Sequence, residues 1–198
     1  GIKIDKYYAS EINKSAITIT QHNFPNTIQL GDVTKININN LPTIDLLLAG
    51  SPCQSLSNAG KREGFSGKSK LFFEFVRILK ELKPKYFLLE NVKMKKEWQD
   101  IISKEVGVSP VKINSCMFSA QKRERLYWTN IPNVTIPEDK KIKLQDIIED
   151  GYVDREKSNC ILESTSRFCV TPSSMRRYMY KNFGQIVFPS REEYEKYV

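Results

Sequence analysis

Histidine is almost absent from the sequence, and no two of the four cysteines have C-x-x-C spacing. Both observations argue against a zinc site, and they favour free thiols in a reducing compartment. The sequence also has no apolar run close to the roughly 20 residues that cross a bilayer, and its start has no pattern of a secretory signal. We therefore expect neither a metal nor a membrane segment, and we expect a cytoplasmic protein.

The 198 residues are 40% hydrophobic and 27% charged, which is ordinary for a soluble globular protein. This length suits one domain with a small appendage. Lysine and arginine outnumber aspartate and glutamate by 31 to 23, which gives a net charge of +8. Such an excess favours a polyanionic partner such as nucleic acid, although it serves solubility equally well.

Short apolar runs alternate with helical patterns along most of the sequence. Strands are predicted at 7–11, 27–30, 44–50, 86–89, 111–114 and 125–129, and helices at 14–22, 71–82 and 95–106. This alternation predicts an α/β fold with a mainly parallel sheet and helices on both faces. After about Pro137 the regularity fades, so residues 138–198 are expected to belong to a second, smaller and less regular domain.

Polar side chains follow four of the predicted strands. Glu11, Asp32, Cys53 and Glu90 should therefore lie at one edge of the sheet, where ligands bind in α/β proteins. An acid in this position can accept hydrogen bonds from the ribose of a nucleoside-containing cofactor, but it is often only a turn former or helix cap. Cys53 lies in the polar, turn-forming stretch 50–55, which is a poor place for a core thiol. It is therefore a candidate nucleophile.

Three motifs occur in a fixed order: Pro-Cys-Gln at 52–54, Glu-Asn-Val at 90–92 and Gln-x-Arg-x-Arg at 121–125. Together they resemble the DNA cytosine-5 methyltransferases, over about residues 1–132 with a weaker continuation to 151. Residues 1–11 and 71–75 are similar to phage and bacterial members, and also to the mammalian de novo enzymes. The resemblance implies a Rossmann-like class I S-adenosylmethionine-dependent catalytic domain over 1–137, followed by part of a target-recognition region over 138–198.

The resemblance also implies a covalent mechanism. The thiolate of Cys53 would add to carbon 6 of a cytosine flipped out of the duplex, and the resulting enamine could attack a methyl sulfonium. Glu90 would contact ring nitrogen 3 and the exocyclic amine, while Arg123 and Arg125 would lie near the base and its phosphates. In an extended strand Gln121, Arg123 and Arg125 share one face, but a solvated edge strand explains that alternation too.

Further contacts follow from the same resemblance. The implied cofactor-binding residues are Glu11 for the ribose, Asp32 for the adenine amine, Ile12 and Val33 as packing neighbours, and Pro52, which shapes the loop. The implied DNA-side residues are Gln54, Ser55, Asn91 and Gln121. The loop from Ser55 to Lys70 is expected to close over the base.

The family's Gly-rich methionine-binding turn, with its strand, is not found before Glu11, and the family's last motif is not found before Val198. That strand is expected at the centre of the sheet, between the strands that end at Glu11 and Cys53. We therefore expect that residues 1–198 alone do not methylate DNA. The sequence could be an excerpt, a subunit completed by a second polypeptide, or an inactive remnant.

Three functions stay open from the sequence. The leading interpretation is methylation of double-stranded DNA, for restriction-modification or phage self-protection in a bacterium or a phage-infected host. A transfer RNA cytosine-5 methyltransferase would carry the same motifs. A non-catalytic DNA-binding or regulatory subunit is the third, but it would not need Cys53, Glu90 and Arg123 together. Roles beyond packing for Cys116, Cys160 and Cys169 also stay open.

Overall fold

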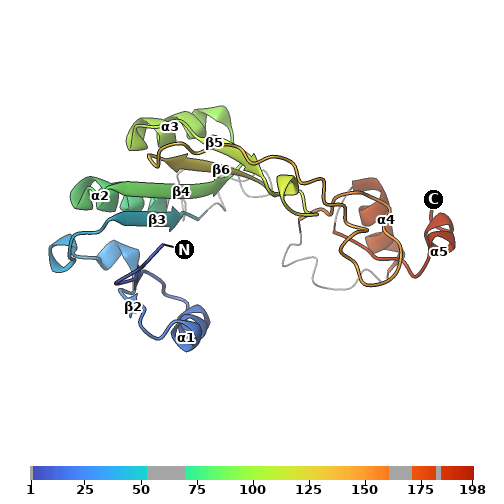
Figure 1. Ribbon diagram of the computed structural model, residues 1–198, viewed down its shortest axis with the longest axis horizontal. Helices are drawn as coiled ribbons and strands as arrows, with labels where there is room; N and C mark the ends of the chain where they lie inside the picture. The colour runs from blue at the N-terminus through green and yellow to red at the C-terminus, as the bar shows by residue number, and fades with distance from the viewer. Residues whose placement is uncertain (1, 53–69, 161–170, 182–183) are drawn as a thin grey trace. The chain divides into compact units, whose positions relative to one another are not determined.

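The computed structural model describes residues 2–52, 70–160, 171–181 and 184–198 (Figure 1). The chain forms two compact units, which are described separately. Unit 1 contains Gly1–Ser109 and Trp128–Ile131, and unit 2 contains Pro110–Tyr127 and Pro132–Val198.

Unit 1 begins with a small β-α-β element. Strands β1 (Tyr8–Ala9) and β2 (Ile28–Gln29) pair in parallel, and helix α1 (Lys14–Asn23) connects them. Asn13 caps α1, because its side chain accepts hydrogen bonds from the backbone N–H groups of Ser15 and Ala16. Two 3₁₀ turns follow β2, η1 (Val33–Lys35) and η2 (Ile38–Asn40).

The rest of unit 1 is built around β3 (Leu46–Gly50) and β4 (Tyr86–Val92), which pair in parallel. Helix α2 (Phe72–Leu82) connects them and buries Phe72, Phe75, Val76 and Ile78. The Phe75 ring packs against Phe87 of β4 with 6.3 Å between the ring centroids. Helix α3 (Lys96–Val106) follows and ends at Gly107, whose φ of 78° suits a glycine.

Strands β5 (Val111–Asn114) and β6 (Glu124–Thr129) pair antiparallel, with η4 (Ser115–Met117) between them. The described strands form two sheets, β1-β2 and β3-β4-β6-β5, and β6 contributes residues to both units. The α/β class is confirmed, but the single, mainly parallel sheet that the sequence predicts is here two sheets, one of them mixed. Among the described strands β3 has one partner, β4.

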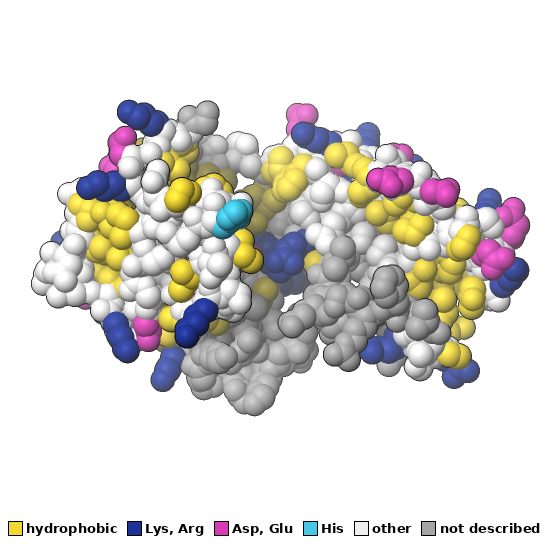
Figure 2. Space-filling view, turned by 90° about the horizontal axis from the view of Figure 1, so that it is seen from below, with side chains coloured by type: hydrophobic (Ala, Val, Ile, Leu, Met, Phe, Trp, Pro, Cys, Tyr) yellow, Lys and Arg dark blue, Asp and Glu magenta, His cyan; other side chains and the backbone are white. Residues whose placement is uncertain are grey.

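Several apolar side chains of unit 1 are exposed to solvent. Ile12 is 73% exposed, and Leu48 of β3 is 52% exposed. Hydrophobic side chains accordingly interrupt the polar surface in Figure 2. For Leu48 this exposure agrees with the place of β3 at the end of the described sheet.

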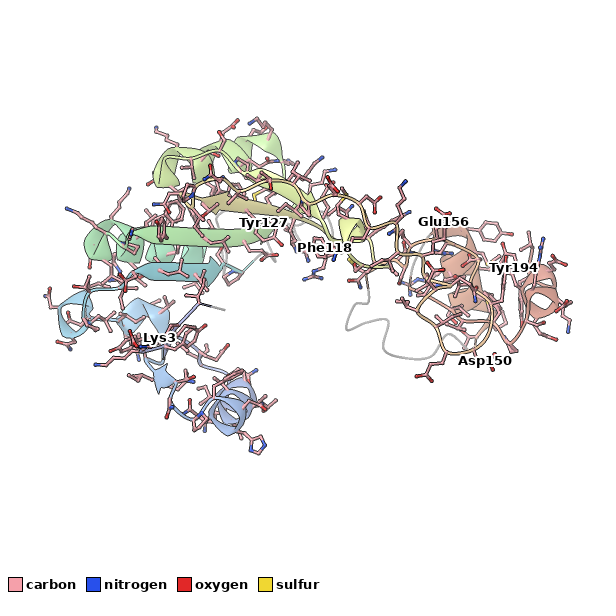
Figure 3. The ribbon with its side chains drawn as sticks, viewed as in Figure 1. Lys3, Phe118, Tyr127, Asp150, Glu156 and Tyr194 are labelled. Atoms are coloured by element: carbon pink, nitrogen blue, oxygen red, sulfur yellow. The ribbon has the colours of Figure 1, made fainter. Side chains whose placement is uncertain are left out.

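Unit 2 has a small apolar core and an aromatic cluster. Ala120, Leu144 and Val153 form the core. In the cluster, the Phe188 ring lies 5.3 Å from Tyr194 of α5 (Arg191–Glu195) and 6.2 Å from Tyr178 of α4 (Pro172–Lys181). Figure 3 labels Tyr194 at this position. The sequence predicts an irregular segment after Pro137, and α4 and α5 are helices that it does not predict.

No helix in the described ranges combines the length and hydrophobicity needed to cross a membrane. Within the same ranges, no group of three or more histidine, cysteine, aspartate or glutamate side chains is arranged to hold a metal ion.

Candidate active site

The carboxyl ends of β3 and β4 lie side by side in unit 1. The parallel register pairs Gly50 with Glu90, and a Cβ added to Gly50 would lie 3.7 Å from Glu90 Oε2. The Glu90 carboxylate therefore lies beside the last residue of β3, three residues before Cys53. The sequence predicts that Glu90 directly follows a strand. In the structure β4 continues to Val92, so Glu90 lies within the strand.

Asn91 joins β4 to the turn that follows β3. Its side chain is buried, and its Nδ2 donates to Ser51 Oγ at 2.9 Å and to Ser51 O at 3.4 Å. Its Oδ1 accepts the backbone N–H of Val92 at 2.8 Å. These bonds fix the backbone two residues before Cys53. Pro52 is the last described residue of this turn, and Cys53, Gln54 and Ser55 lie outside the described residues, as does most of the predicted closing loop.

Replacing Asn91 with alanine should lower the free energy of unfolding by about 1–3 kcal/mol, because it removes the part-buried hydrogen bonds to Ser51 and Val92 and empties the buried space of the amide. Urea unfolding would measure the change. As a control, Asn39→Ala removes an exposed amide and should change stability by less than about 0.5 kcal/mol. Equal stabilities of the two variants would contradict a positioning role for Asn91.

The two acids predicted to bind the cofactor organise the turns after β1 and β2. Glu11 Oε1 accepts the backbone N–H groups of Ile12 at 2.7 Å and Asn13 at 2.8 Å. Asp32 Oδ1 accepts the N–H of Thr34 at 2.9 Å and its hydroxyl at 2.8 Å. The bonds from Asn13 and Ile12 lower the pKa of Glu11, and those from Thr34 lower the pKa of Asp32. Both acids are thus held ionised, each through one oxygen, as turn-forming residues.

The two turns are also linked to each other. Because β1 and β2 are parallel, both turns leave the same edge, and Ser10 Oγ donates to Gly31 O at 2.7 Å across them. Exposed Ile12 and half-buried Val33 follow the two acids. An apolar surface beside two ionised carboxylates suits a nucleoside, with an apolar base and hydroxyl donors on the sugar.

Sequence reasoning missed the residue that holds η1 in place. Arg77 of α2 donates from Nη2 to Val33 O at 3.2 Å and from Nη1 to Ile36 O at 3.3 Å. Its Nε donates to Glu74 Oε2 at 2.9 Å, which orients the guanidinium. The position of Arg77 in an amphipathic helix gives no signal that it binds carbonyls 41 and 44 residues away.

The arginines of the third motif lie in unit 2. The predicted strand 125–129 is β6, which begins at Glu124, so the alternation of Gln121, Arg123 and Arg125 does not lie on one extended strand. Gln121 instead forms a bridge with Ser158, and the Lys122 N–H donates to Ser158 O at 2.8 Å. Arg123 is exposed, while Arg125 is half-buried and donates from Nη1 to Glu124 O at 2.8 Å. The structure thus brings Glu90 and Asn91 to the β3 turn, and it places the arginines with the other unit.

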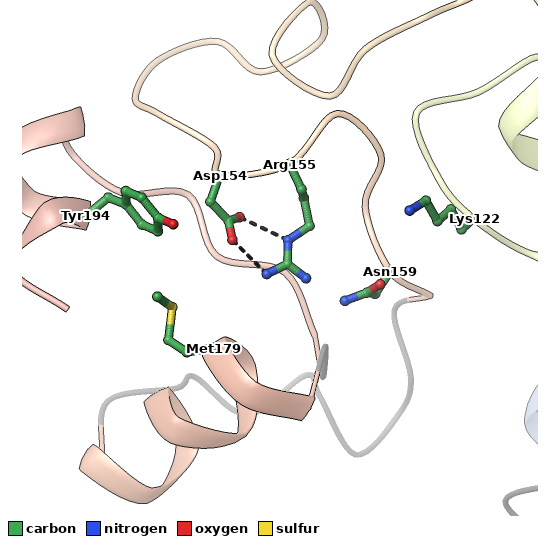
Figure 4. Close-up of a pocket in the computed structure, with 6 residues that line it drawn as sticks. All are labelled: Lys122, Asp154, Arg155, Asn159, Met179 and Tyr194. Atoms are coloured by element: carbon green, nitrogen blue, oxygen red, sulfur yellow. Dashed lines mark hydrogen bonds and ion pairs between the residues drawn. The ribbon is translucent and has the colours of Figure 1, made fainter. Parts of the chain in front are cut away.

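Unit 2 contains a polar pocket of about 340 Å³ (Figure 4). Its lining residues are Lys122, Asp154, Arg155, Asn159, Met179 and Tyr194. Arg155 pairs with both oxygens of Asp154 at 3.0 and 2.7 Å, and its guanidinium lies 4.3 Å from the centroid of the Tyr178 ring. The Tyr178 hydroxyl donates to Asp154 Oδ1. Burial and this bond to Asp154 raise the pKa of Tyr178. The sequence gives no sign of this cluster, because Tyr178 lies 24 residues after Asp154 and none of the three residues belongs to a motif.

Asp154 should make the stability of unit 2 dependent on pH. Burial acts to raise the pKa of Asp154, but hydrogen bonds from Arg155 and Tyr178 outweigh it, and the pKa is lowered. A lowered folded pKa gives stability that is present above the unfolded value of about 3.9 and is lost as pH falls further. Urea unfolding of Asp154→Asn should show a loss of about 1–3 kcal/mol at pH 7. The difference from the parent should shrink below pH 4, and a constant difference would contradict this role.

Comparison with known proteins identifies relatives of the chain. The profile of the C-5 cytosine-specific DNA methylase family matches residues 1–182. The orphan methyltransferase M.SPRI of Bacillus phage SPR is 39% identical over 168 residues, which cover 76% of this chain and 38% of that protein. The type II methyltransferase M.BsuFI of Bacillus subtilis is 49% identical over 101 residues, covering 47% of this chain and 24% of that protein.

A third relative, the type II methyltransferase M.NlaIV of Neisseria lactamica, is 49% identical over 86 residues, covering 43% of this chain and 20% of that protein. The chain thus spans between 20% and 38% of the length of these three relatives. A crystal structure assigned to a DNA modification methyltransferase encoded within an Escherichia coli prophage superposes with a TM-score of 0.53 and 26% identity. The superposition covers 76% of this chain and 51% of the other.

Proposed function

Because this chain belongs to the C-5 cytosine-specific DNA methylase family, we propose that it forms the catalytic part of an enzyme that methylates carbon 5 of cytosine in double-stranded DNA. The observation that carries this proposal is the family match over residues 1–182, which includes all three motifs in order. Two features of unit 1 support it. The Glu90 carboxylate lies beside the end of β3, and Asn91 ties down the turn that leads to Cys53.

The proposed nucleophile is the thiolate of Cys53. Its sulfur forms a bond to carbon 6 of the cytosine, and the electrons of the 5,6 double bond make carbon 5 nucleophilic. Glu90 would act as a general acid toward ring nitrogen 3, so that negative charge does not build up on the ring. Arg123 and Arg125 would lie near the base and its phosphates and stabilise the flipped nucleotide. Gln121, Gln54 and Ser55 are proposed as further contacts on the DNA side.

S-adenosylmethionine, which this family generally uses, supplies the methyl group as an electrophilic sulfonium. The residues proposed to hold it follow β1 and β2 and the end of β3. Glu11 and Asp32 would accept hydrogen bonds from the nucleoside, with their unused oxygens available for this purpose. Ile12, Val33 and Pro52 would provide apolar contact, and the 73% exposure of Ile12 leaves that surface open to a ligand.

The relatives indicate a biological setting. They are type II and orphan methyltransferases of bacteria and of a bacterial phage. We therefore propose a role in restriction-modification or in protection of phage DNA.

Covalent capture tests the proposal without requiring methyl transfer. A duplex with 5-azacytosine in place of cytosine presents a more electrophilic carbon 6, and its adduct with a thiol persists in detergent. We expect a gel band of protein joined to DNA, and none with the unmodified duplex. A transfer RNA with the same base should be captured far less. Salt-sensitive binding to the duplex without capture would contradict the enzyme and favour a non-catalytic DNA-binding subunit.

A further inference from the structure

Three segments of unit 2 converge on one ammonium group. The half-buried side chain of Lys157 donates to three backbone carbonyls, those of Cys116 at 2.8 Å, Ser119 at 3.2 Å and Ile142 at 2.6 Å. An ammonium group has three donors, so each of them has an acceptor here. Lys157 therefore joins parts of the chain that are up to 41 residues apart.

The residue after Lys157 holds the same region through its backbone. The Ser158 N–H donates to Ala120 O at 2.6 Å, and Ser158 O accepts the N–H of Lys122 at 2.8 Å. Together with the bonds of Lys157, these contacts attach the segment from Cys116 to Lys122 along most of its length. The segment is thus fixed by two consecutive residues that follow it far along the chain.

The backbone of Arg123 depends on the same turn. Its N–H donates to Asn114 Oδ1 at 3.0 Å, and its carbonyl accepts the N–H of Ser115 at 3.1 Å. Asn114 Oδ1 also accepts the N–H of Cys116 at 3.2 Å, and the carbonyl of Cys116 is one of the three that bind Lys157. The side chain of Arg123 is exposed, so its guanidinium extends from a backbone that is held on both sides.

We propose that Lys157 is a positioning residue of the methylation reaction, which fixes the backbone of Arg123 and with it the place of the guanidinium beside the flipped nucleotide. This inference rests on the proposed function, in which Arg123 lies near the base and its phosphates. Without the ammonium group, three carbonyl oxygens converge on a space that has no donor, and the turn must rearrange. A misplacement of about 1 Å in a reacting site can lower a rate on the order of a hundredfold.

The rate of covalent capture at saturating duplex tests the role of Lys157. Lys157→Met keeps the length of the side chain and removes its donors, so we expect capture of the 5-azacytosine duplex to slow by about 10- to 100-fold. The affinity for the duplex and its salt dependence should stay those of the parent, because the ammonium group is engaged within the protein. The matched control is Lys143→Met, which changes an exposed lysine of the same unit that pairs with Glu156 at 3.0 Å. This control should capture at the parent rate.

Circular dichroism would verify that the variants are folded. Lys157→Gln keeps two N–H donors, and it takes the place of the methionine variant if that variant is unfolded. The glutamine variant should also capture more slowly than the parent, because one carbonyl at least has lost its donor.

Combination with Arg123→Ala separates positioning from a merely structural role. Because Lys157 acts through Arg123, adding Lys157→Met to Arg123→Ala should slow capture by no more than about twofold further. Fully additive losses, or capture by Lys157→Met at the parent rate, would overturn the inference. A slope of log Kobs against log[salt] reduced by about 0.9 in Lys157→Met would also overturn it, since that change reports a direct phosphate contact. Each of these results leaves capture by the parent chain, and with it the proposed function, intact. Absence of capture by the parent chain would overturn both.

Discussion

Replacing Cys53 with serine is expected to abolish covalent capture of the 5-azacytosine duplex. A hydroxyl has almost no anionic form at neutral pH, whereas a few per cent of an ordinary cysteine thiol is already thiolate, which is a far better nucleophile. We expect the rate of adduct formation to fall on the order of a thousandfold or more, the scale on which loss of a nucleophile acts in other enzymes. Binding to the unmodified duplex should change little, because serine keeps nearly the same shape.

The chain provides a matched control for this substitution. Cys116 is a free, half-buried thiol in unit 2, and Cys116→Ser should leave the capture rate unchanged. A Cys53→Ser variant that still forms the adduct would show that another thiol attacks the base. Cys53 would then not be the nucleophile, although the chain would still belong to the family.

Replacing Glu90 with glutamine is expected to have the second largest effect. The amide keeps the shape of the carboxyl group and can still donate a hydrogen bond, but it cannot transfer a proton to ring nitrogen 3. General acid catalysis typically contributes about 10²–10⁴-fold, so we expect the capture rate to fall within that range. Measuring the rate at saturating duplex separates this loss from any loss of binding.

The control for Glu90 is Glu97→Gln, which changes an exposed acid in the first turn of α3. This variant should capture the duplex at the parent rate. A Glu90→Gln variant that reacts as fast as the parent would mean that the carboxylate beside Gly50 only supports the end of β3. The proposed mechanism would then require another group to stabilise the adduct.

Much of unit 1 could be predicted because its signals are local. Phe72, Phe75 and Val76 recur with the helical period, and Lys83-Pro84 ends the helix where the structure ends α2. Apolar runs without polar alternation mark β3 and β4 as strands. The order of strands and helices then places Glu11, Asp32 and Glu90 near strand ends.

The remaining features depend on contacts between distant residues. The segment just before β6 pairs with Ser158, 37 residues beyond Gln121, and no local pattern announces this contact. Helix α4 is mostly polar, and the buried ring of Tyr178 attaches it to Asp154 and Arg155. The division of the strands into two sheets is likewise a long-range property, which no short motif contains.

The most direct test of the account is to find the atom that joins the protein to the DNA. The chain captured on a 5-azacytosine duplex would be digested, and the peptide that carries the base would be sequenced by mass spectrometry. The account predicts that the base is attached to Cys53, in the peptide that follows β3. Attachment to Cys116, Cys160 or Cys169, or the absence of any attachment when the duplex is bound, would contradict it.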